Sequence, residues 1–269
     1  MQLTKQTGGS IETRTVVGMI AALLTATSAC SVEPAAPAVR TCPSLYEAGI
    51  SPALLNTKLA VSTKSLCFGV FALLHSGVTR TSLYVAEHLT RASVQAARAF
   101  ETRDNRFHPE VSLRQTDRGE LADYRGSGFD RGHMAPSGDM GSAEDDFESF
   151  SLANIVPQDG PLNRNGWADL ESYVRDLTTK LGDAYVVTGP AFAGVNLRRL
   201  NGRVLVPSHL WKAVYVPGQG AGAWIVTNEP NAQWEVVSIA TLAARTGIDP
   251  FPKLDAAAKA KVPAFPTFE

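Results

Sequence analysis

The apolar residues of the chain fall into short clusters that predict alternating strands and helices. Residues 66–74 (LCFGVFALL) form a compact apolar run whose length and flanks favour a buried strand, although periodicity alone does not exclude a helix. Residues 81–89 resume the strand pattern after a turn, so the two segments predict a hairpin. The strongest helical pattern covers residues 163–181, where apolar side chains recur every three or four positions before Gly182.

Further strands and helices are interspersed along the rest of the chain. Strand patterns cover residues 151–157, 184–188, 204–206, 210–216 and 223–227, and helical patterns cover residues 93–100, 142–150 and 238–246. No shift in composition marks a boundary within residues 42–269. We therefore predict one α+β domain over residues 42–269, with a central, mostly antiparallel sheet flanked by helices.

The first 29 residues have the pattern of a secretory signal peptide. Lys5 and Arg14 precede an apolar run at residues 16–24, and small residues follow as far as Ala29. The run is shorter than the roughly 20 apolar residues that a membrane-spanning helix needs. We expect residues 1–29 to direct export.

The segment after the signal peptide is rich in Ala and Pro, so residues 30–41 are expected to form a tether. The residues around Cys30 (TSAC) are similar to a bacterial lipoprotein cleavage site, which would place a lipid on Cys30. Cleavage after Ala29 or Ala38 without a lipid is the alternative. The expected location is therefore the periplasm, a lipid-anchored position on a membrane, or the medium.

The cysteine count agrees with export. If Cys30 is lipidated or removed, Cys42 and Cys67 remain as an even pair that can form a disulfide in an oxidising compartment. The alternative is two reduced, buried cysteines. No C-x-x-C motif or Cys/His cluster is present, which excludes the usual structural zinc sites.

The composition is that of an ordinary globular protein, with 44% hydrophobic and 19% charged residues in 269. The net charge of -1 argues against a strongly basic nucleic-acid coat protein. An enzyme that contacts a few phosphates needs only a local positive patch, so this class remains open.

The stretch FDRGHMAPSGD at residues 129–139 presents His133 in a segment that Gly and Pro keep out of a regular helix. A strand with Asn154 and Gln158 follows, and then the long helix with Asn163 and Glu171. On a continuous helix the last two residues would differ by about 80°, so both would face the same side. A β-β-α unit of this kind can direct all of these side chains to one point.

These residue types suit the cleavage of a phosphodiester. A neutral histidine is the natural base near pH 7, and arginine matches phosphate oxygens. An asparagine carbonyl is a neutral ligand for a divalent ion, and a nearby glutamate can hold the water molecules of that ion.

The same residues resemble the DNA/RNA non-specific endonucleases, the ββα-metal nucleases. The signature Asp130-Arg131-Gly132-His133, the N-x-x-P-Q strand that begins at Asn154 and the N-x-x-x-W-x-x-x-E helix that begins at Asn163 are all similar to this family. The Arg-x-x-x-Phe loop that begins at Arg103 and the stretch VPSHLWK at residues 206–212 extend the similarity. Glu110 stands where the family usually has Asp.

The resemblance implies a role for each residue. His133 would be the general base, Asn163 the direct Mg²⁺ ligand (with Mn²⁺ as a substitute), and Glu171 the holder of metal-bound water. Arg131 and Arg103 would lie near the phosphate, Asn154 would order the site, and Gln158 would contribute more weakly to binding substrate. The implied substrates are DNA and RNA, and the implied products carry 5′-phosphates.

Two other functions are compatible with the same residues. The chain could be a catalytically inactive surface lipoprotein that binds nucleic acid, although a binder has no need of the base. It could also be a phosphodiesterase acting on small substrates.

Overall fold

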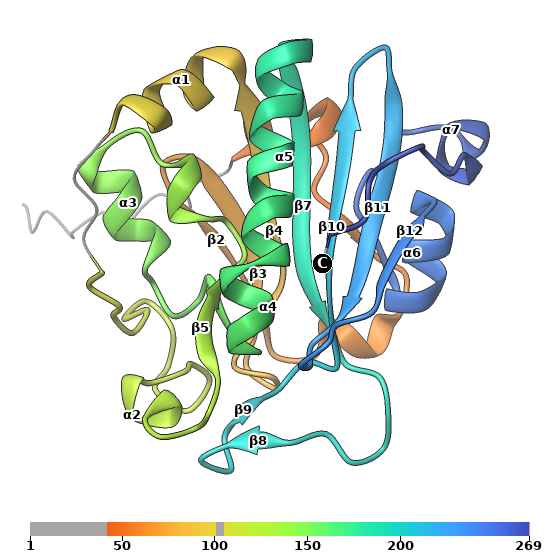
Figure 1. The fold of residues 1–269 in the computed structure, drawn as a ribbon. Coiled ribbons are helices and arrows are strands. Elements are labelled where there is room, and N and C mark those ends of the chain that lie inside the picture. Colours follow the sequence, from red (N-terminus) through yellow and green to blue (C-terminus); the bar gives the residue numbers. More distant parts are fainter. Residues whose placement is uncertain (1–41, 101–104, 269) are drawn as a thin grey trace, which may run out of the picture. The chain divides into compact units, whose positions relative to one another are not determined.

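The computed structural model describes residues 42–100 and 105–268, which build one unit around a seven-stranded sheet. The strand order is β12-β11-β10-β7-β4-β3-β2, and every neighbouring pair is antiparallel (Figure 1). The strands are β2 (Thr63–Cys67), β3 (Phe71–Ser76), β4 (Thr81–Thr90), β7 (Asp183–Ala191), β10 (His209–Val216), β11 (Gly220–Thr227) and β12 (Trp234–Val237). The α+β fold class with an antiparallel central sheet is confirmed.

Three short strand pairs lie outside the main sheet. They are β1 (Ala53–Leu54) with β13 (Ile248–Asp249), β5 (Asp130–His133) with β6 (Ile155–Gln158), and β8 (Arg199–Leu200) with β9 (Val204–Leu205). The helices are α1 (Arg91–Ala99), α2 (Leu121–Tyr124), α3 (Ala143–Ser149), α4 (Gly160–Arg164), α5 (Gly166–Leu181), α6 (Ile239–Thr246) and α7 (Ala256–Ala260). Single 3-10 turns are η1 (Pro43–Leu45), η2 (Glu47–Gly49), η3 (Thr57–Ala60) and η4 (Ser137–Asp139). None of the described helices is long and apolar enough to cross a membrane.

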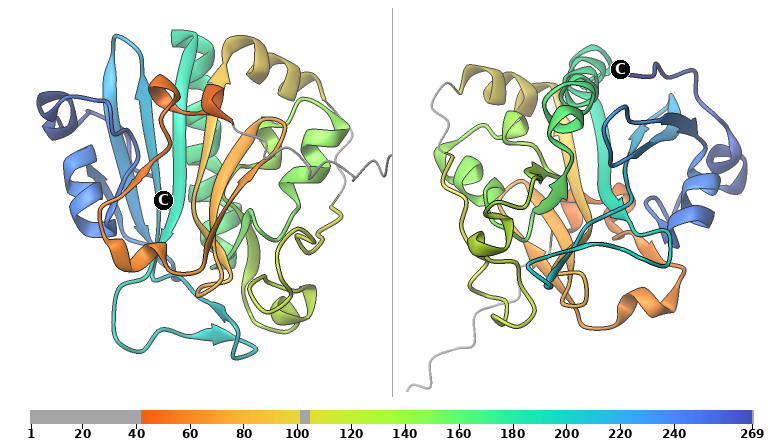
Figure 2. Two further views of the ribbon diagram at one scale, coloured as in Figure 1. Left: turned by 180° about the vertical axis from the view of Figure 1, so that it is seen from behind. Right: turned by 60° about the horizontal axis from the view of Figure 1, so that its bottom comes forward.

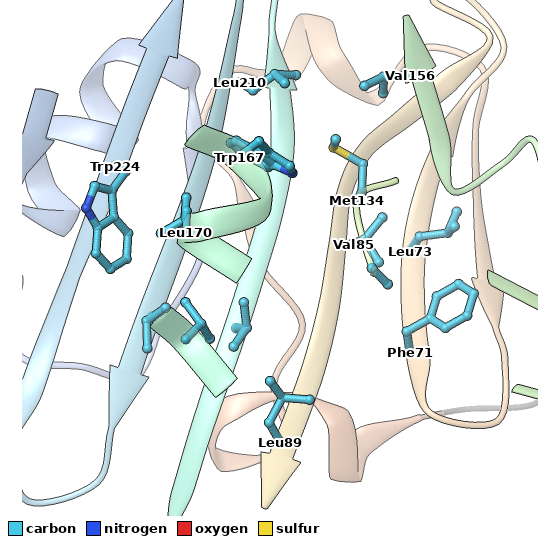
Figure 3. Packing of buried hydrophobic residues seen from close by; sticks show 14 of the residues in the cluster. Phe71, Leu73, Val85, Leu89, Met134, Val156, Trp167, Leu170, Leu210 and Trp224 are labelled. Carbon is cyan, nitrogen blue, oxygen red and sulfur yellow. The ribbon is translucent and has the colours of Figure 1, made fainter. Parts of the chain in front are cut away.

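Both faces of the sheet are covered. On one face, Trp167, Leu170 and Val174 of α5 pack against strand residues such as Val85 and Leu210 (Figure 3). On the other face, α6 and the segment around β1 cover a second cluster (Figure 2). Because alternate residues of a strand point to opposite faces, Leu210 belongs to the first core and its neighbour in β10 to the second. The sheet is thus a rigid wall against which α5 is fixed.

The chain end packs over the first core. The ring of Phe265 stacks on Trp224 with centroids 4.4 Å apart, and Trp224 Nε1 donates a hydrogen bond to the carbonyl of Pro266 at 2.7 Å. Phe268 makes an edge contact with Trp234 at 5.6 Å between ring centroids. The aromatic residues of the tail therefore complete the cover of the outer sheet strands.

Two details of the predicted elements are corrected. The apolar run at residues 66–74 is not one strand, because β2 ends at Cys67 and β3 begins at Phe71. The predicted helix over residues 163–181 is two helices, α4 and α5, which are separated at Asn165. The predicted helix start at Ser142 is confirmed, since its hydroxyl accepts a hydrogen bond from the Asp145 amide at 3.1 Å.

The N-terminal predictions fall partly outside the described residues. The signal peptide, the tether and Cys30 lie in residues 1–41, whose structure is not described. Cys42 and Cys67 form a disulfide with a Cα–Cα distance of 5.9 Å, so this pairing is confirmed. The bond ties the first turn of the described chain to the edge strand β2.

Candidate functional site

The two strands β5 and β6 form the base of the site. They pair antiparallel, so Asp130 lies opposite Gln158 and His133 lies opposite Ile155. The turn after β6 leads directly into α4, which has a proline in its first turn. Proline suits the start of a helix because its missing amide hydrogen would have no partner there. The β-β-α order expected from the sequence is present.

Asp130 organises the polar groups at the start of α4. Its carboxylate accepts a hydrogen bond from Asn163 Nδ2 at 3.1 Å. It also accepts two hydrogen bonds from Arg164, each at 2.8 Å. These contacts hold the pKa of Asp130 below its ordinary value, with the bond from Arg164 as the largest cause. An ionised carboxylate only accepts hydrogen bonds, so Asp130 fixes the amide nitrogen of Asn163 and turns its Oδ1 away.

A break in the helix positions Asn163 independently of Glu171. Asn165 has φ −119° and ψ −99°, which ends α4 before α5 begins. The angle of about 80° between Asn163 and Glu171 assumed a continuous helix, so the premise of that estimate is wrong. Asn163 therefore lies on the short helix α4 and Glu171 on the longer helix α5, and the two helices meet at Asn165.

A cleft of about 1000 Å³ opens beside this turn. Asp130, Arg131 and Asn163 line it together. Phe107 and Phe129 add aromatic rings to the lining. The guanidinium of Arg131 lies 4.2 Å from the centroid of the Phe107 ring. The cleft thus combines cationic and aromatic surfaces, which suit a nucleic-acid strand.

His133 lies against two aromatic rings, Phe107 and Phe150, which we call the aromatic wall. Its ring centroid is 5.5 Å from that of Phe107 and 4.8 Å from that of Phe150. Within the described part of the chain, Nε2 is closed off from solvent and has no hydrogen-bond partner. This apolar setting lowers the pKa of His133 to about 4, and the charge of Asp146 only partly opposes the effect. The imidazole is therefore neutral at pH 7, which a general base requires.

Glu171, on α5, interacts with a set of buried charges. Burial raises its pKa to about 7, the charge of Lys212 opposes this, and the charge of Asp139 adds to it. Lys212 is 2% exposed and donates a hydrogen bond from Nζ to Thr188 Oγ1 at 2.6 Å. Arg175, one turn after Glu171, forms an ion pair with Asp139 at 2.9 Å. The glutamate is therefore poised to gain or lose a proton near neutral pH.

Asn154 is a positioning residue that does not reach the cleft. It is fully buried, and its Oδ1 accepts a hydrogen bond from the Ala135 amide at 2.9 Å. Its Nδ2 donates to the carbonyls of Ala135 and Ser149 at 2.8 and 2.9 Å. The side chain therefore fixes the backbone two residues after His133, which is compatible with the ordering role that the resemblance implies.

Gln158 does not fit a role in binding substrate. Its side chain is fully buried, and neither of its amide atoms has a hydrogen-bond partner in the described residues. It occupies the space beside Gly132, where a Cβ would collide with it. The glycine of the signature is thus required by the close approach of Gln158.

Two upstream residues complete the comparison with the sequence. Arg103 lies outside the described residues, so its position beside the phosphate stays a prediction. Glu110 binds the Ser112 amide at 3.0 Å and the Ser151 hydroxyl at 3.1 Å through its two carboxylate oxygens. It braces the loop between Phe107 and α3, although it is longer by one methylene than the usual Asp.

Two features of the site were not predicted from the sequence: the aromatic wall around His133 and the burial of Lys212. The Arg-x-x-x-Phe spacing included Phe107, but nothing in the pattern indicated that its ring would cover His133. Lys212 lies on β10, a strand of mostly apolar residues. The one signal for its burial is that it shares a strand face with Leu210 and Val214, which belong to the first core. In the described residues no cluster of three His, Cys, Asp or Glu side chains could hold a metal ion.

The comparisons with known proteins decide the family. Residues 51–257 match the model of the DNA/RNA non-specific endonuclease family. The chain belongs to this family. A nuclease from Nostoc sp. is 34% identical over 211 residues, which cover 72% of this chain and 75% of that protein. Nuclease C1 of Cunninghamella echinulata is 39% identical over 166 residues, which cover 56% of this chain and 66% of that protein.

A solved structure of a similar protein has the same fold. It is a crystal structure of the EndoG/EndoGI complex, described as showing the mechanism of EndoG inhibition, and it has 26% sequence identity and a TM-score of 0.66. The alignment covers 72% of this chain and 88% of that chain. The chain spans less than two thirds of the nucleases from Cunninghamella echinulata, Syncephalastrum racemosum and Xenopus laevis, with 66%, 36% and 49% of their lengths.

Proposed function

We propose that this protein is a Mg²⁺-dependent endonuclease that hydrolyses phosphodiester bonds in both DNA and RNA and leaves 5′-phosphate ends. The observation that carries the proposal is the pair Asp130 and Asn163, which directs an amide oxygen away from Asp130 in a cleft that also contains Arg131. The neutral His133, on the same strand as Asp130 and Arg131, supplies a base.

The residues present fit a hard divalent ion. Asn163 Oδ1 is an oxygen ligand oriented by a second residue, and Mg²⁺ prefers few protein ligands and several water molecules. Glu171 would hold the metal-bound water, and Mn²⁺ is expected to replace Mg²⁺. When bound, the ion acts as a Lewis acid on the phosphate and on the leaving oxygen.

The protein groups divide the remaining tasks. Nε2 of His133 is closed off, so Nδ1 is the nitrogen that accepts a proton from the attacking water. Nε2 then carries the hydrogen of the neutral ring. Arg131 places a permanent positive charge beside the phosphate and neutralises charge that develops in the transition state.

We expect the enzyme to show little preference for the sugar or for the base sequence, because its cleft contacts the phosphate and the faces of the bases. Arginine side chains that address phosphate oxygens carry no information about the base sequence. The aromatic rings Phe107 and Phe129 offer stacking surfaces that accept any base. DNA and RNA share both features, so one cleft serves both.

Export is part of the proposal. A non-specific nuclease would damage the genome of its own cell, and residues 1–29 have the pattern of a signal peptide. The disulfide between Cys42 and Cys67 agrees with an oxidising compartment. Mass spectrometry of the mature N-terminus tests export, and it also tests whether Cys30 carries a lipid.

The test of the activity is digestion of plasmid DNA and of RNA by the purified protein. Cleavage should need Mg²⁺ or Mn²⁺, stop in EDTA, and fall by roughly 10²–10⁴-fold in His133→Ala. DNA binding by the variant should persist. Cleavage that continues in EDTA or in the variant would refute the mechanism, and binding without any cleavage would favour a catalytically inactive nucleic-acid-binding protein.

A further inference from the structure

Five arginines at one end of the molecule form no ion pair within the described part of the chain. They lie on or next to β5, α2, the β8–β9 hairpin and the β3–β4 turn, and we call them the arginine strip: Arg80, Arg125, Arg131, Arg198 and Arg199. Several arginines elsewhere are neutralised by carboxylates, as in Arg245 with Glu235 and Arg98 with Asp176. Arg91 on α1 instead donates to the carbonyls of Thr179 and Lys180 and, among the described residues, stands alone. The protein has a net charge of only -1, so this grouping is a local positive surface.

Arg198 joins the β8–β9 hairpin to the catalytic cleft. Its guanidinium lies 5.0 Å from the centroid of the Phe129 ring, and Phe129 lines the cleft. It donates a hydrogen bond to the carbonyl of Ser127 at 2.9 Å. The side chain is thus held beside the cleft by neutral partners, and its charge stays available to an external anion.

Arg199 and Arg80 continue the positive surface away from the cleft. Arg199 donates to the carbonyls of Arg203 and Val78 at 2.9 and 3.4 Å. Arg80 donates to the carbonyl of Thr116 at 2.8 Å. Burial, followed by the charge of Arg203, lowers the pKa of Arg80. The positive charges of Arg80, Arg199 and Arg203 are therefore close together, and neither Arg80 nor Arg199 forms an ion pair with a carboxylate in the described residues.

The hairpin that carries the strip is firmly attached. Arg203 forms an ion pair at 3.1 Å with Asp123, which is buried in α2. Asn201 also donates to Asp123 at 3.3 Å. Figure 1 shows β8, β9 and α2 at the same end of the sheet. The neutralised arginine thus anchors the hairpin, and the arginines without ion pairs are displayed on a fixed support.

We propose that the arginine strip binds the phosphodiester backbone of the nucleic acid on one side of the scissile bond. This inference rests on the proposed function, because the strip begins at the cleft that holds the reacting phosphate. Guanidinium groups match phosphate oxygens, and a row of them follows a backbone with one charge per nucleotide. The strip therefore selects long substrates over short ones.

The experiment measures the salt dependence of binding to a DNA duplex in EDTA for the native protein and for Arg199→Gln and Arg80→Gln. Glutamine keeps a donor for the backbone carbonyls but removes the charge. Each substitution should lower the slope of log affinity against log salt by about 1, because one phosphate contact is lost. Cleavage of a single-phosphodiester nitrophenyl ester of thymidine should be unchanged in both variants.

The matched control is Arg245→Gln on α6, because Arg245 is paired with Glu235 and lies outside the strip. Its slope should equal that of the native protein. If Arg199→Gln and Arg80→Gln bind DNA with the same salt-dependence slope as the native protein, the proposed role of the arginine strip is wrong. The proposal also fails if the two variants lose as much cleavage activity on the nitrophenyl ester as on DNA. Cleavage is assayed separately, so a native protein that binds DNA without cutting would contradict the proposed function while the slopes still decide the inference.

Discussion

Asp130 accepts a hydrogen bond from the side-chain amide of Asn163 at 3.1 Å, and this contact leaves the amide oxygen as the atom that would face the proposed metal ion. In Asp130→Asn, the new amide can pair with either end of Asn163, so the orientation is lost. We expect affinity for Mg²⁺ to fall by roughly 10–100-fold. Titration calorimetry with Mg²⁺ measures this, and Asp169→Asn on the exposed side of α5 is the control. Native affinity in Asp130→Asn would contradict the assignment.

The aromatic wall predicts a pKa effect at His133. Phe107→Leu removes an aromatic ring that covers the imidazole, so water reaches the ring and the charged form becomes less unfavourable. The pKa of His133 should rise from about 4 toward its ordinary value of 6.5. An NMR titration of the imidazole measures the shift. Phe147→Leu is the control, since Phe147 stacks on His108 instead, and a shift of equal size there would argue against a specific effect of Phe107.

Glu171 predicts that binding of Mg²⁺ depends on pH near neutrality. Its pKa is raised to about 7, so the carboxylate is mostly protonated a unit below this value and mostly ionised a unit above it. Affinity for Mg²⁺ should therefore rise across this range, and Glu171→Gln should remove the dependence. Because the charge of Lys212 lowers the Glu171 pKa, Lys212→Met should move the transition to higher pH. A native pH profile that is flat across neutrality would disprove this role.

Glu87 predicts a pH dependence of stability. Burial raises the pKa of Glu87 well above its ordinary value, and its Oε2 has no hydrogen-bond partner in the described residues. The unfolded chain ionises this group at lower pH than the folded protein does. Its contribution to stability is therefore complete below about pH 4.5 and is lost as pH rises toward the folded pKa. Glu87→Gln should reduce the fall of the melting temperature between mildly acidic and mildly alkaline pH, whereas Glu235→Gln on the surface should not.

The disulfide predicts a measurable loss of stability on reduction. Cys42 and Cys67 are separated by 25 positions. Opening a loop of this size restores chain entropy to the unfolded state, which costs about 3–4 kcal/mol of folding free energy. Urea denaturation with and without a reducing agent measures the difference. The variant with serine at both positions should match the reduced protein, and equal stability under all conditions would show that the bond is not formed.

The sequence predicted the elements of the site better than their geometry. Three elements were identifiable from the sequence, because spacing and capping are local properties. They are the strand that contains His133, the strand that follows Asn154 and the helical segment after Pro161. The break at Asn165 was missed in the predicted helix over residues 163–181, although residues 163–166 (NRNG) contain no large apolar side chain and the apolar period of α5 begins only at Trp167. A pattern of side chains does not report one unusual pair of backbone angles.

Burial of polar side chains was the second property that the sequence could not settle. Asn154 and Gln158 lie on one short segment, and the resemblance implied that Asn154 orders the site and that Gln158 contributes more weakly to binding substrate. In the structure the Asn154 side chain forms hydrogen bonds with the backbone of Ala135, before α3, and of Ser149, at the end of α3. The side chain of Gln158 instead fills the space beside Gly132. Which of two amides reaches a cleft depends on partners from distant segments, so only the folded chain distinguishes them.

The tail that contains Phe265 and Phe268 sets the boundary of any fragment chosen for experiment. The family match stops at residue 257, yet Phe265 stacks on Trp224 and the Pro266 carbonyl accepts the indole hydrogen of the same tryptophan. A chain cut at the end of the family match would leave a buried tryptophan exposed and its polar nitrogen without a partner. Such a fragment should be poorly soluble even though every residue of the proposed site is present.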